Sequence, residues 1–169
     1  MKKILVIQNK RIGDVLIASV LANNLKKILP DSQITYFVYD YTAGVLEQNP
    51  NIDRVILAQD KELKKFSVLL KTLRDIRKER YDIILDPYAK LQSRLMCLFS
   101  KAPVRLGFKR ANKKLKLPFY THPVDFLSKA SLPCGKALED RINMLKKGFT
   151  LPNPDYHYRI FLNEKERSY

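Results

Sequence analysis

Two hydrophobic patterns alternate along the first two thirds of the chain. Short hydrophobic segments at residues 3–7, 34–39, 55–57, 83–85 and 104–108 predict strands, and the continuous apolar runs at 4–7 and 83–85 are typical of strands buried on both faces. Apolar positions at helical spacing fall between them, in residues 12–29, 42–48, 66–76 and 93–99. Strands that alternate with helices in this order predict right-handed βαβ crossovers. We therefore expect an α/β fold, a Rossmann-like parallel sheet with helices on both faces.

The alternation ends after residue 108. Residues 109–133 are basic and contain three prolines, which predicts a segment that is mostly loop. One more helix is expected at residues 138–149, where apolar positions return to helical spacing.

The last residues predict a link to a further domain. The sequence Leu-Pro-Asn-Pro at 151–154 is typical of a stiff, extended linker, and residues 156–162 predict one more strand. We therefore expect residues 1–150 to form one Rossmann-like domain. Residues 151–169 would be a linker and the start of a second domain.

Length and composition narrow the class of protein. A chain of 169 residues with 46% hydrophobic content can bury one substantial core. The apolar stretch from Ile4 to Ile7 is too short for a secretion signal or a membrane span, so we expect a cytoplasmic protein. Cys97 and Cys134 form neither a CxxC pair nor a metal knuckle, and we expect both to be reduced.

The chain is strongly basic. It has 32 Lys and Arg against 17 Asp and Glu, a formal net charge of +15, which attracts the phosphates of nucleic acid, anionic lipid or a nucleotide. The densest basic run covers residues 101–120 and has no acidic residue. Such a run is either a solvated loop or a specific site, and charge alone does not decide between them.

The segment 8–16 carries the most informative candidate chemistry. It follows the first strand, and open α/β sheets bind ligands beyond the carboxyl ends of their strands. It has neither the G-x-G-x-x-G pattern nor a P-loop, but it offers Gly13, the free amides of a helix start and the carboxylate of Asp14. Asp14 could cap the helix or act as a general base, and the two roles are compatible.

Several spaced motifs resemble one known family. They are Arg-Ile-Gly-Asp-Val-Leu at 11–16, Asn-Pro-Asn-Ile-Asp-Arg-Val-Ile at 49–56, Tyr-Asp-Ile-Ile-Leu-Asp at 81–86 and Val-Arg-Leu-Gly-Phe at 104–108. In this order they resemble the heptosyltransferases of glycosyltransferase family 9, which add heptose to the lipopolysaccharide inner core. The resemblance spans residues 3–149.

The resemblance implies a GT-B enzyme with two Rossmann-like domains and no metal. It implies inverting transfer from a nucleotide-sugar, of the ADP-heptose type, as co-substrate without a further cofactor. The catalytic base of the family falls on Asp14. The donor-binding domain would follow residue 162, so we expect the 169-residue chain to have no transferase activity by itself.

Other residues are candidates for contacts with the acceptor, the lipopolysaccharide core on lipid A. We expect acceptor contacts from Gly13 and from the cationic residues Lys10, Arg11, Arg94, Lys109, Arg110 and Lys113. For these cations, a solvated position without a ligand is the alternative. Asp86 ends a strand at the same sheet edge as Asp14, where it could cap a turn or touch substrate.

A non-catalytic binding protein would also account for the strongly basic composition. A non-catalytic basic α/β module that binds nucleic acid or an anionic surface is the alternative, but the chain has no RRM, KH or zinc-finger motif, so nucleic acid is not expected as a partner. For the enzyme, the basic loops predict peripheral contact with the cytoplasmic leaflet of the inner membrane.

Overall fold

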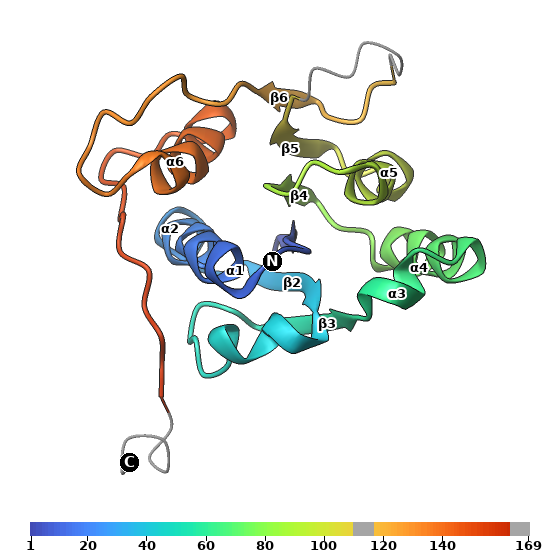
Figure 1. Cartoon of the computed structure of the whole chain (residues 1–169). Coiled ribbons are helices and arrows are strands. Elements are labelled where there is room, and N and C mark those ends of the chain that lie inside the picture. The colour runs from blue at the N-terminus through green and yellow to red at the C-terminus, as the bar shows by residue number, and fades with distance from the viewer. Residues whose placement is uncertain (110–116, 163–169) are drawn as a thin grey trace.

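The computed structural model describes residues 1–109 and 117–162, and these residues form one parallel sheet (Figure 1). The strands are β1 (Lys3–Ile7), β2 (Gln33–Tyr39), β3 (Arg54–Ala58), β4 (Ile83–Asp86), β5 (Val104–Phe108) and β6 (His122–Val124). Their order across the sheet is β3-β2-β1-β4-β5-β6, and every adjacent pair is parallel. The Rossmann-like α/β prediction is therefore confirmed.

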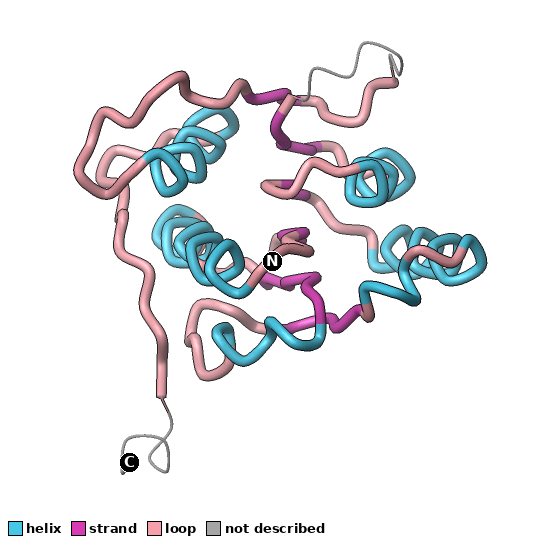
Figure 2. The backbone as a smooth tube through the Cα atoms, viewed as in Figure 1, coloured by secondary structure: helices cyan, strands magenta, loops and turns pink. Residues whose placement is uncertain are grey.

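Helices cover both faces of this sheet, as Figures 1 and 2 show. One face carries α1 (Ile12–Ala18), α2 (Val20–Ile28) and α6 (Lys136–Gly148). The other carries α3 (Asp60–Leu63), α4 (Phe66–Glu79) and α5 (Leu91–Ser100). A 3₁₀ helix, η1 (Asp40–Leu46), follows β2.

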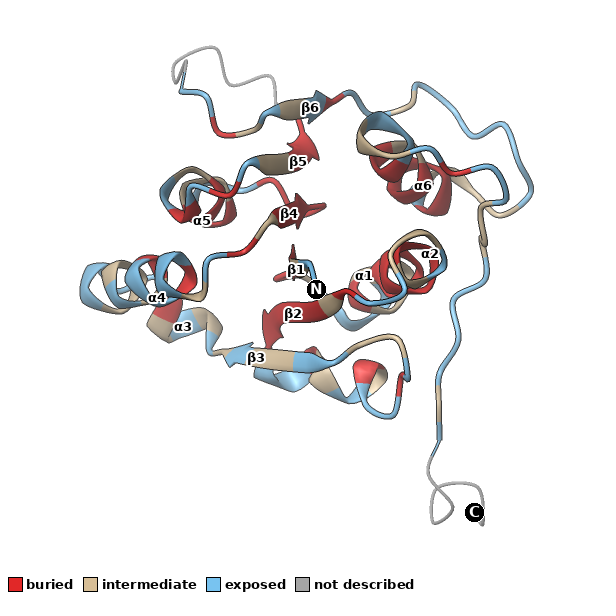
Figure 3. Cartoon of the chain, turned by 180° about the vertical axis from the view of Figure 1, so that it is seen from behind, coloured by how far each residue is buried: buried red, intermediate tan, exposed pale blue. Residues whose placement is uncertain are grey.

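The sheet separates two hydrophobic cores, one on each face, and the central strand β1 contributes residues to both. Ile4 and Val6 pack into the core under α1, α2 and α6, while Leu5 and Ile7 pack into the core under α4 and α5. Because successive strand residues point to opposite faces, a strand covered on both sides must be apolar throughout. The most deeply buried segments accordingly lie in the middle of the molecule (Figure 3).

Three local features differ from the sequence prediction. The helix expected at 12–29 is divided at Ser19, whose hydroxyl donates to the Leu16 carbonyl at 2.7 Å and competes with the helical hydrogen bonds. The short helix expected at 42–48 is the 3₁₀ helix η1, which begins two residues earlier. The predicted loop 109–133 contains the edge strand β6, where Pro123 is tolerated because an edge strand has an unpaired side.

The prediction of a strand at residues 156–162 is wrong. Within the described residues, 151–162 form no strand, and the segment leaves α6 as an extended chain (Figure 1). The Asn24 side chain in α2 donates to the Asp155 carbonyl at 2.7 Å and accepts from the Asp155 amide at 2.8 Å. A side chain of a helix thus supplies the backbone pairing that a neighbouring strand would otherwise provide. The domain division at residue 150 stays a prediction.

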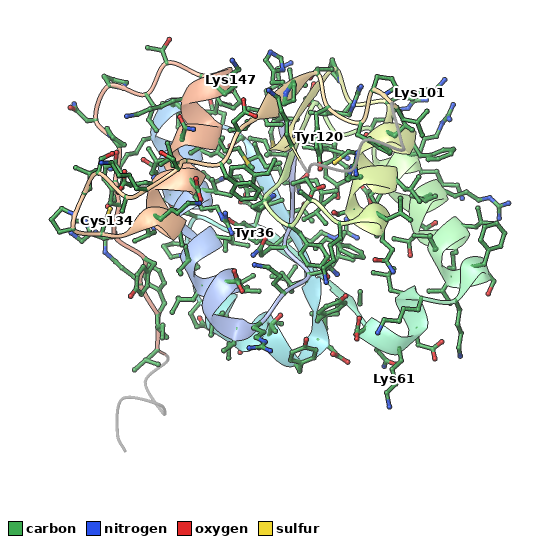
Figure 4. The ribbon with its side chains drawn as sticks, turned by 45° about the horizontal axis from the view of Figure 1, so that its top comes forward. Tyr36, Lys61, Lys101, Tyr120, Cys134 and Lys147 are labelled. Carbon is green, nitrogen blue, oxygen red and sulfur yellow. The ribbon has the colours of Figure 1, made fainter. Side chains whose placement is uncertain are left out.

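Gly107 in β5 provides a test of the packing. A methyl group at this position would overlap the ring of Tyr120, labelled in Figure 4, whose hydroxyl donates to Asp86 at 2.6 Å. We expect Gly107→Ala to destabilise the protein by about 1–3 kcal/mol, as overpacking does. Urea unfolding measures this change.

Gly44→Ala is the matched control, because a methyl group there would meet nothing within 4 Å. Its effect should stay within about 0.5 kcal/mol, the usual range of surface substitutions. Equal stability of the Gly107 variant and the wild type would contradict the packing of Tyr120.

Candidate active site at the carboxyl edge of the sheet

The connections leave β1 and β4 in opposite directions across the sheet. The chain passes from β1 to β2 and β3 on one side, and then from β4 to β5 and β6 on the other. Such a switch point opens a crevice beyond the carboxyl ends of the two strands, where open α/β sheets bind their ligands. The turn from β1 into α1 lies at this point.

A polar cleft of about 530 Å³ lies at this edge. Its wall is built by Tyr39 at the end of β2 and by residues that follow β1, β2, β3 and β4, namely Asn9, Lys10, Arg11, Asp14, Tyr41, Asp60, Lys64, Tyr88, Lys90 and Gln92. Four of them are cationic and two are acidic, so the cleft favours anionic or polar ligands. A second hollow of about 760 Å³ lies between β3 and α4, away from the switch point. We place the candidate site at the first cleft because it occupies the position where this fold binds ligands.

Asp14 lies in the first turn of α1 and faces this cleft. Its side chain is 32% exposed, and its Oδ1 accepts a hydrogen bond from Lys10 Nζ at 2.8 Å. No backbone amide of the helix start donates to it among the described residues, and the N-cap is Arg11. Asp14 therefore does not cap α1 by a hydrogen bond, and its carboxylate is held instead by the ion pair with Lys10 in the cleft wall.

Gly13 leaves the approach to Asp14 open. A methyl group at Gly13 would meet no atom within 4 Å, and its backbone does not have a positive φ. Neither packing nor conformation requires glycine here. The missing side chain leaves open space at the start of α1, next to Asp14 in the chain.

The structure brings together only part of the predicted acceptor site. Lys10 and Arg11 line the cleft with Asp14. Arg94 instead stacks on Phe119, with 4.1 Å between the guanidinium carbon and the ring centre, and Lys109 pairs with Asp125 at 2.7 Å beside a different hollow. Neither lines the cleft of Asp14. The predicted contacts Arg110 and Lys113 lie outside the described residues.

Asp86 holds the turn after β4. It is fully buried, and its carboxylate accepts from the amides of Tyr88 at 3.2 Å and Ala89 at 2.8 Å and from the Tyr120 hydroxyl. Burial raises the pKa of Asp86, and these hydrogen bonds partly offset the rise. Of the two roles left open by the sequence, turn capping is the one that the geometry supports.

Arg141 is a residue that the sequence analysis missed. It is 4% exposed, its guanidinium lies 5.5 Å from the centre of the Phe108 ring, and its Nε has no hydrogen-bond partner. Burial lowers the pKa of Arg141, and the charge of Asp14 is the strongest opposing influence. A signal existed, because position 141 falls between Leu138 and Leu145 on the apolar face of the predicted helix.

The described residues show neither a metal centre nor a membrane-spanning helix. Residues 1–109 and 117–162 hold no group of three or more His, Cys, Asp or Glu side chains placed to bind a metal ion. In the same residues, every helix is too short or too polar to cross a bilayer.

With this fold and cleft, the chain is similar to known glycosyltransferases. No protein-family model matches it. It is 29% identical over 94 residues to lipopolysaccharide heptosyltransferase 1 of Campylobacter coli, covering 56% of this chain and 27% of that protein. It is 22% identical over 134 residues to the lipopolysaccharide core heptosyltransferase OpsX of Haemophilus influenzae, covering 73% of this chain and 38% of that protein.

Solved structures show the same fold. A family 9 glycosyltransferase from Veillonella parvula superposes with a TM-score of 0.78 and 24% identity, covering 97% of this chain and 46% of that chain. ADP-heptose lipopolysaccharide heptosyltransferase II of E. coli gives a TM-score of 0.71 and 19% identity, covering 99% of this chain and 49% of that chain. The resemblance to family 9 is confirmed, and the chain spans about half the length of these structures.

Asp86 predicts a pH-dependent stability. Because its folded pKa lies above the ordinary value of 3.8, the folded protein keeps a proton that the unfolded chain has already lost. Stability should therefore fall as pH rises through the window between the ordinary and the raised pKa, by up to about 1.4 kcal/mol per pH unit. Asp86→Asn removes this dependence, so wild type should lose stability relative to the variant across that window.

Urea unfolding of both proteins from pH 4 to pH 8 tests this expectation. Tyr120→Phe removes the side-chain hydrogen bond that lowers the Asp86 pKa most, so it should widen the window. A stability difference between wild type and Asp86→Asn that stays constant with pH would contradict the raised pKa.

Proposed function

We propose that this chain is the N-terminal, acceptor-side half of an inverting glycosyltransferase of the lipopolysaccharide heptosyltransferase kind, with Asp14 as its general base. The observation that carries the proposal is the partly exposed Asp14 carboxylate in the wall of the cleft beyond β1. This turn also carries the motif that resembles family 9. A positioned carboxylate at the mouth of a polar cleft is what activation of a hydroxyl requires.

The proposed reaction is a single displacement. Asp14 takes the proton of an acceptor hydroxyl as that oxygen attacks the anomeric carbon of the donor sugar. The bond between this carbon and the nucleotide phosphate breaks, and the nucleoside diphosphate leaves with the electron pair, so the anomeric configuration inverts. Lys10, 2.8 Å from Asp14, keeps the base oriented during the transfer.

The substrates of the proposed enzyme follow from the relatives. One solved structure with a TM-score of 0.68 is E. coli heptosyltransferase WaaC with ADP-2-deoxy-2-fluoro heptose. We propose ADP-heptose as donor and co-substrate, with no metal, and a lipopolysaccharide core sugar as acceptor. The cations Lys10, Arg11, Lys64 and Lys90 around the cleft suit the anionic groups of such an acceptor.

We also propose that the 169 residues alone do not catalyse transfer. The chain aligns with 46–51% of the length of the solved structures. In the proposed architecture, the rest of the enzyme holds the nucleotide and its leaving phosphate. A base alone contributes about 10² to 10⁴-fold, whereas positioning and stabilisation of the leaving group supply most of the acceleration.

Asp14→Asn tests the role of the base. We would join this chain to the remaining half of the Veillonella parvula protein and measure ADP release from ADP-heptose with a heptose-free lipopolysaccharide acceptor. The hybrid should turn over, and Asp14→Asn should lower its kcat by about 10² to 10⁴-fold. The chain without the second half should release no ADP above background.

Asp31→Asn, in an exposed turn between α2 and β2, is the charge-matched control and should leave kcat unchanged. Undiminished turnover by the Asp14 variant would remove Asp14 from the mechanism. Turnover by the chain alone would refute the need for a second half.

Membrane contact is a further part of the proposal. Three helices begin with a cation at the N-cap, Arg11 in α1, Lys65 in α4 and Lys90 in α5. Each cation is followed by a large exposed apolar residue, and these are Ile12 (54% exposed), Phe66 (74%) and Leu91 (55%). Helices that follow parallel strands begin at the carboxyl edge, so these pairs lie at the same edge of the sheet as the cleft, and Arg11 and Lys90 line it. We propose that this edge contacts the anionic cytoplasmic leaflet, where a lipid-anchored acceptor is presented.

Vesicle sedimentation tests the membrane contact. The chain should sediment with vesicles that contain anionic lipid and dissociate with added salt. Lys90→Glu should weaken binding about fivefold or more, since each basic residue near an anionic surface contributes about 1 kcal/mol. Lys101→Glu, on an exposed residue at the opposite edge of the sheet, is the control and should bind as wild type. Equal losses in the two variants would show that net charge, and not this edge, drives binding.

A further inference from the structure

Buried polar atoms without hydrogen-bond partners gather where β1 ends. Asn9 is 2% exposed, and neither its Oδ1 nor its Nδ2 has a partner. The adjacent Gln8 is fully buried, donates from Nε2 to the Asp14 carbonyl at 3.2 Å, and leaves its Oε1 without a partner. Because buried polar atoms are almost always paired in folded proteins, this group calls for an explanation.

Packing of the protein does not explain Asn9. An unpaired buried carboxamide costs stability, because it loses its hydrogen bonds to water without replacing them. A leucine has the same branched side-chain outline and no polar atom, so it would avoid this penalty. Residues that lower stability in this way are typical of functional sites.

The position of Asn9 indicates that its unpaired carboxamide atoms are available to a ligand in the cleft. Asn9 lines the same cleft as Asp14 and lies five residues before it in the chain. It follows β1, in the turn that leads into α1. The same cleft wall contains the tyrosines Tyr39 and Tyr88. A ligand held in this cleft therefore has both Asp14 and Asn9 in its wall.

We propose that Asn9 is a specificity-determining residue that reads two neighbouring hydroxyls of the acceptor sugar. Its Nδ2 donates to one hydroxyl, and its Oδ1 accepts from the next. A neutral carboxamide, which donates and accepts from adjacent atoms, matches a vicinal diol, whose oxygens also do both. The cations of the cleft are suited instead to anionic groups. This inference rests on the proposed function and adds the part of the substrate that Asn9 recognises.

The expected discrimination is large for a single side chain. A site that hydrogen-bonds a substrate hydroxyl rejects the analogue that lacks it, because its own polar atoms are then left unpaired. For the hydroxyl pair read by Asn9 we expect a preference on the order of 10 to 100-fold, the effect of one or two hydrogen bonds.

Two measurements on Asn9→Leu test the proposal. The first is the thermal unfolding midpoint of the free chain, which should be equal to or higher than that of wild type, because the substitution removes an unpaired buried amide. The second is an NMR titration with a heptose-free, deacylated lipopolysaccharide core oligosaccharide, which the variant should bind at least tenfold more weakly. Asn153→Leu, an exposed amide after α6, is the matched control and should change neither.

A second probe separates recognition of hydroxyls from general damage to the site. It is the same oligosaccharide with the hydroxyls next to the heptose-accepting position methylated. Wild type should bind it as weakly as Asn9→Leu binds the parent sugar, and Asn9→Leu should no longer distinguish the two probes. Asn9→Asp, which accepts but does not donate, should lose part of the discrimination.

The possible failures point to different conclusions. A lower unfolding midpoint or failure of Asn9→Leu to fold would mean that Asn9 is structural, and would overturn the inference. Unchanged binding and discrimination by Asn9→Leu would overturn it while leaving the proposed function intact. If wild type binds neither probe, the proposed acceptor is wrong, and the role of Asn9 falls with it.

Discussion

The rest of the structure depends on the burial of β1 on both faces and both sides. Ile4 to Ile7 are fully buried, β2 and β4 pair with the strand, and helices from two separate parts of the chain cover it. Because β1 has a neighbouring strand on each side, the connection to the next element can leave it only at its end. In this topology the carboxyl end of β1 is also where the connections diverge, so the position of the cleft follows from the burial of the central strand.

Polar residues at the carboxyl edge of the sheet fall into two groups, those that hold the local structure and those available to a ligand. Asp86 is buried and fully engaged in organising the turn after β4, and its carboxylate is expensive to bury even with its hydrogen bonds. The buried Asn9 carboxamide and the Nε of buried Arg141 have no hydrogen-bond partner, whereas Asp14 is partly exposed and paired with Lys10. Unpaired buried polar atoms also occur at Asn49, Tyr81 and Arg94, but those of Gln8 and Asn9 lie at the edge where a ligand would pair with them.

The comparisons with solved structures show how this architecture persists while the sequence changes. At 18–24% identity, the superpositions still cover 91–97% of this chain. What two such sequences must share is the burial pattern that places β1 between two layers of helices. Charges outside the core are free to differ, so one fold can serve different substrates.

The sequence by itself determined the features that depend on local pattern. The five strands β1 to β5 were predictable because each is a short, mostly hydrophobic segment between helical segments, and Asp14 was predictable as a candidate because it follows the first of these strands. Tertiary structure decided the rest. The three-residue strand β6 exists through pairing with β5, the expected strand at 156–162 is replaced by pairing with the Asn24 side chain, and Arg94 and Lys109 lie away from the cleft. These outcomes depend on contacts between residues far apart in the chain. A local pattern of hydrophobic positions does not report the energies of such contacts.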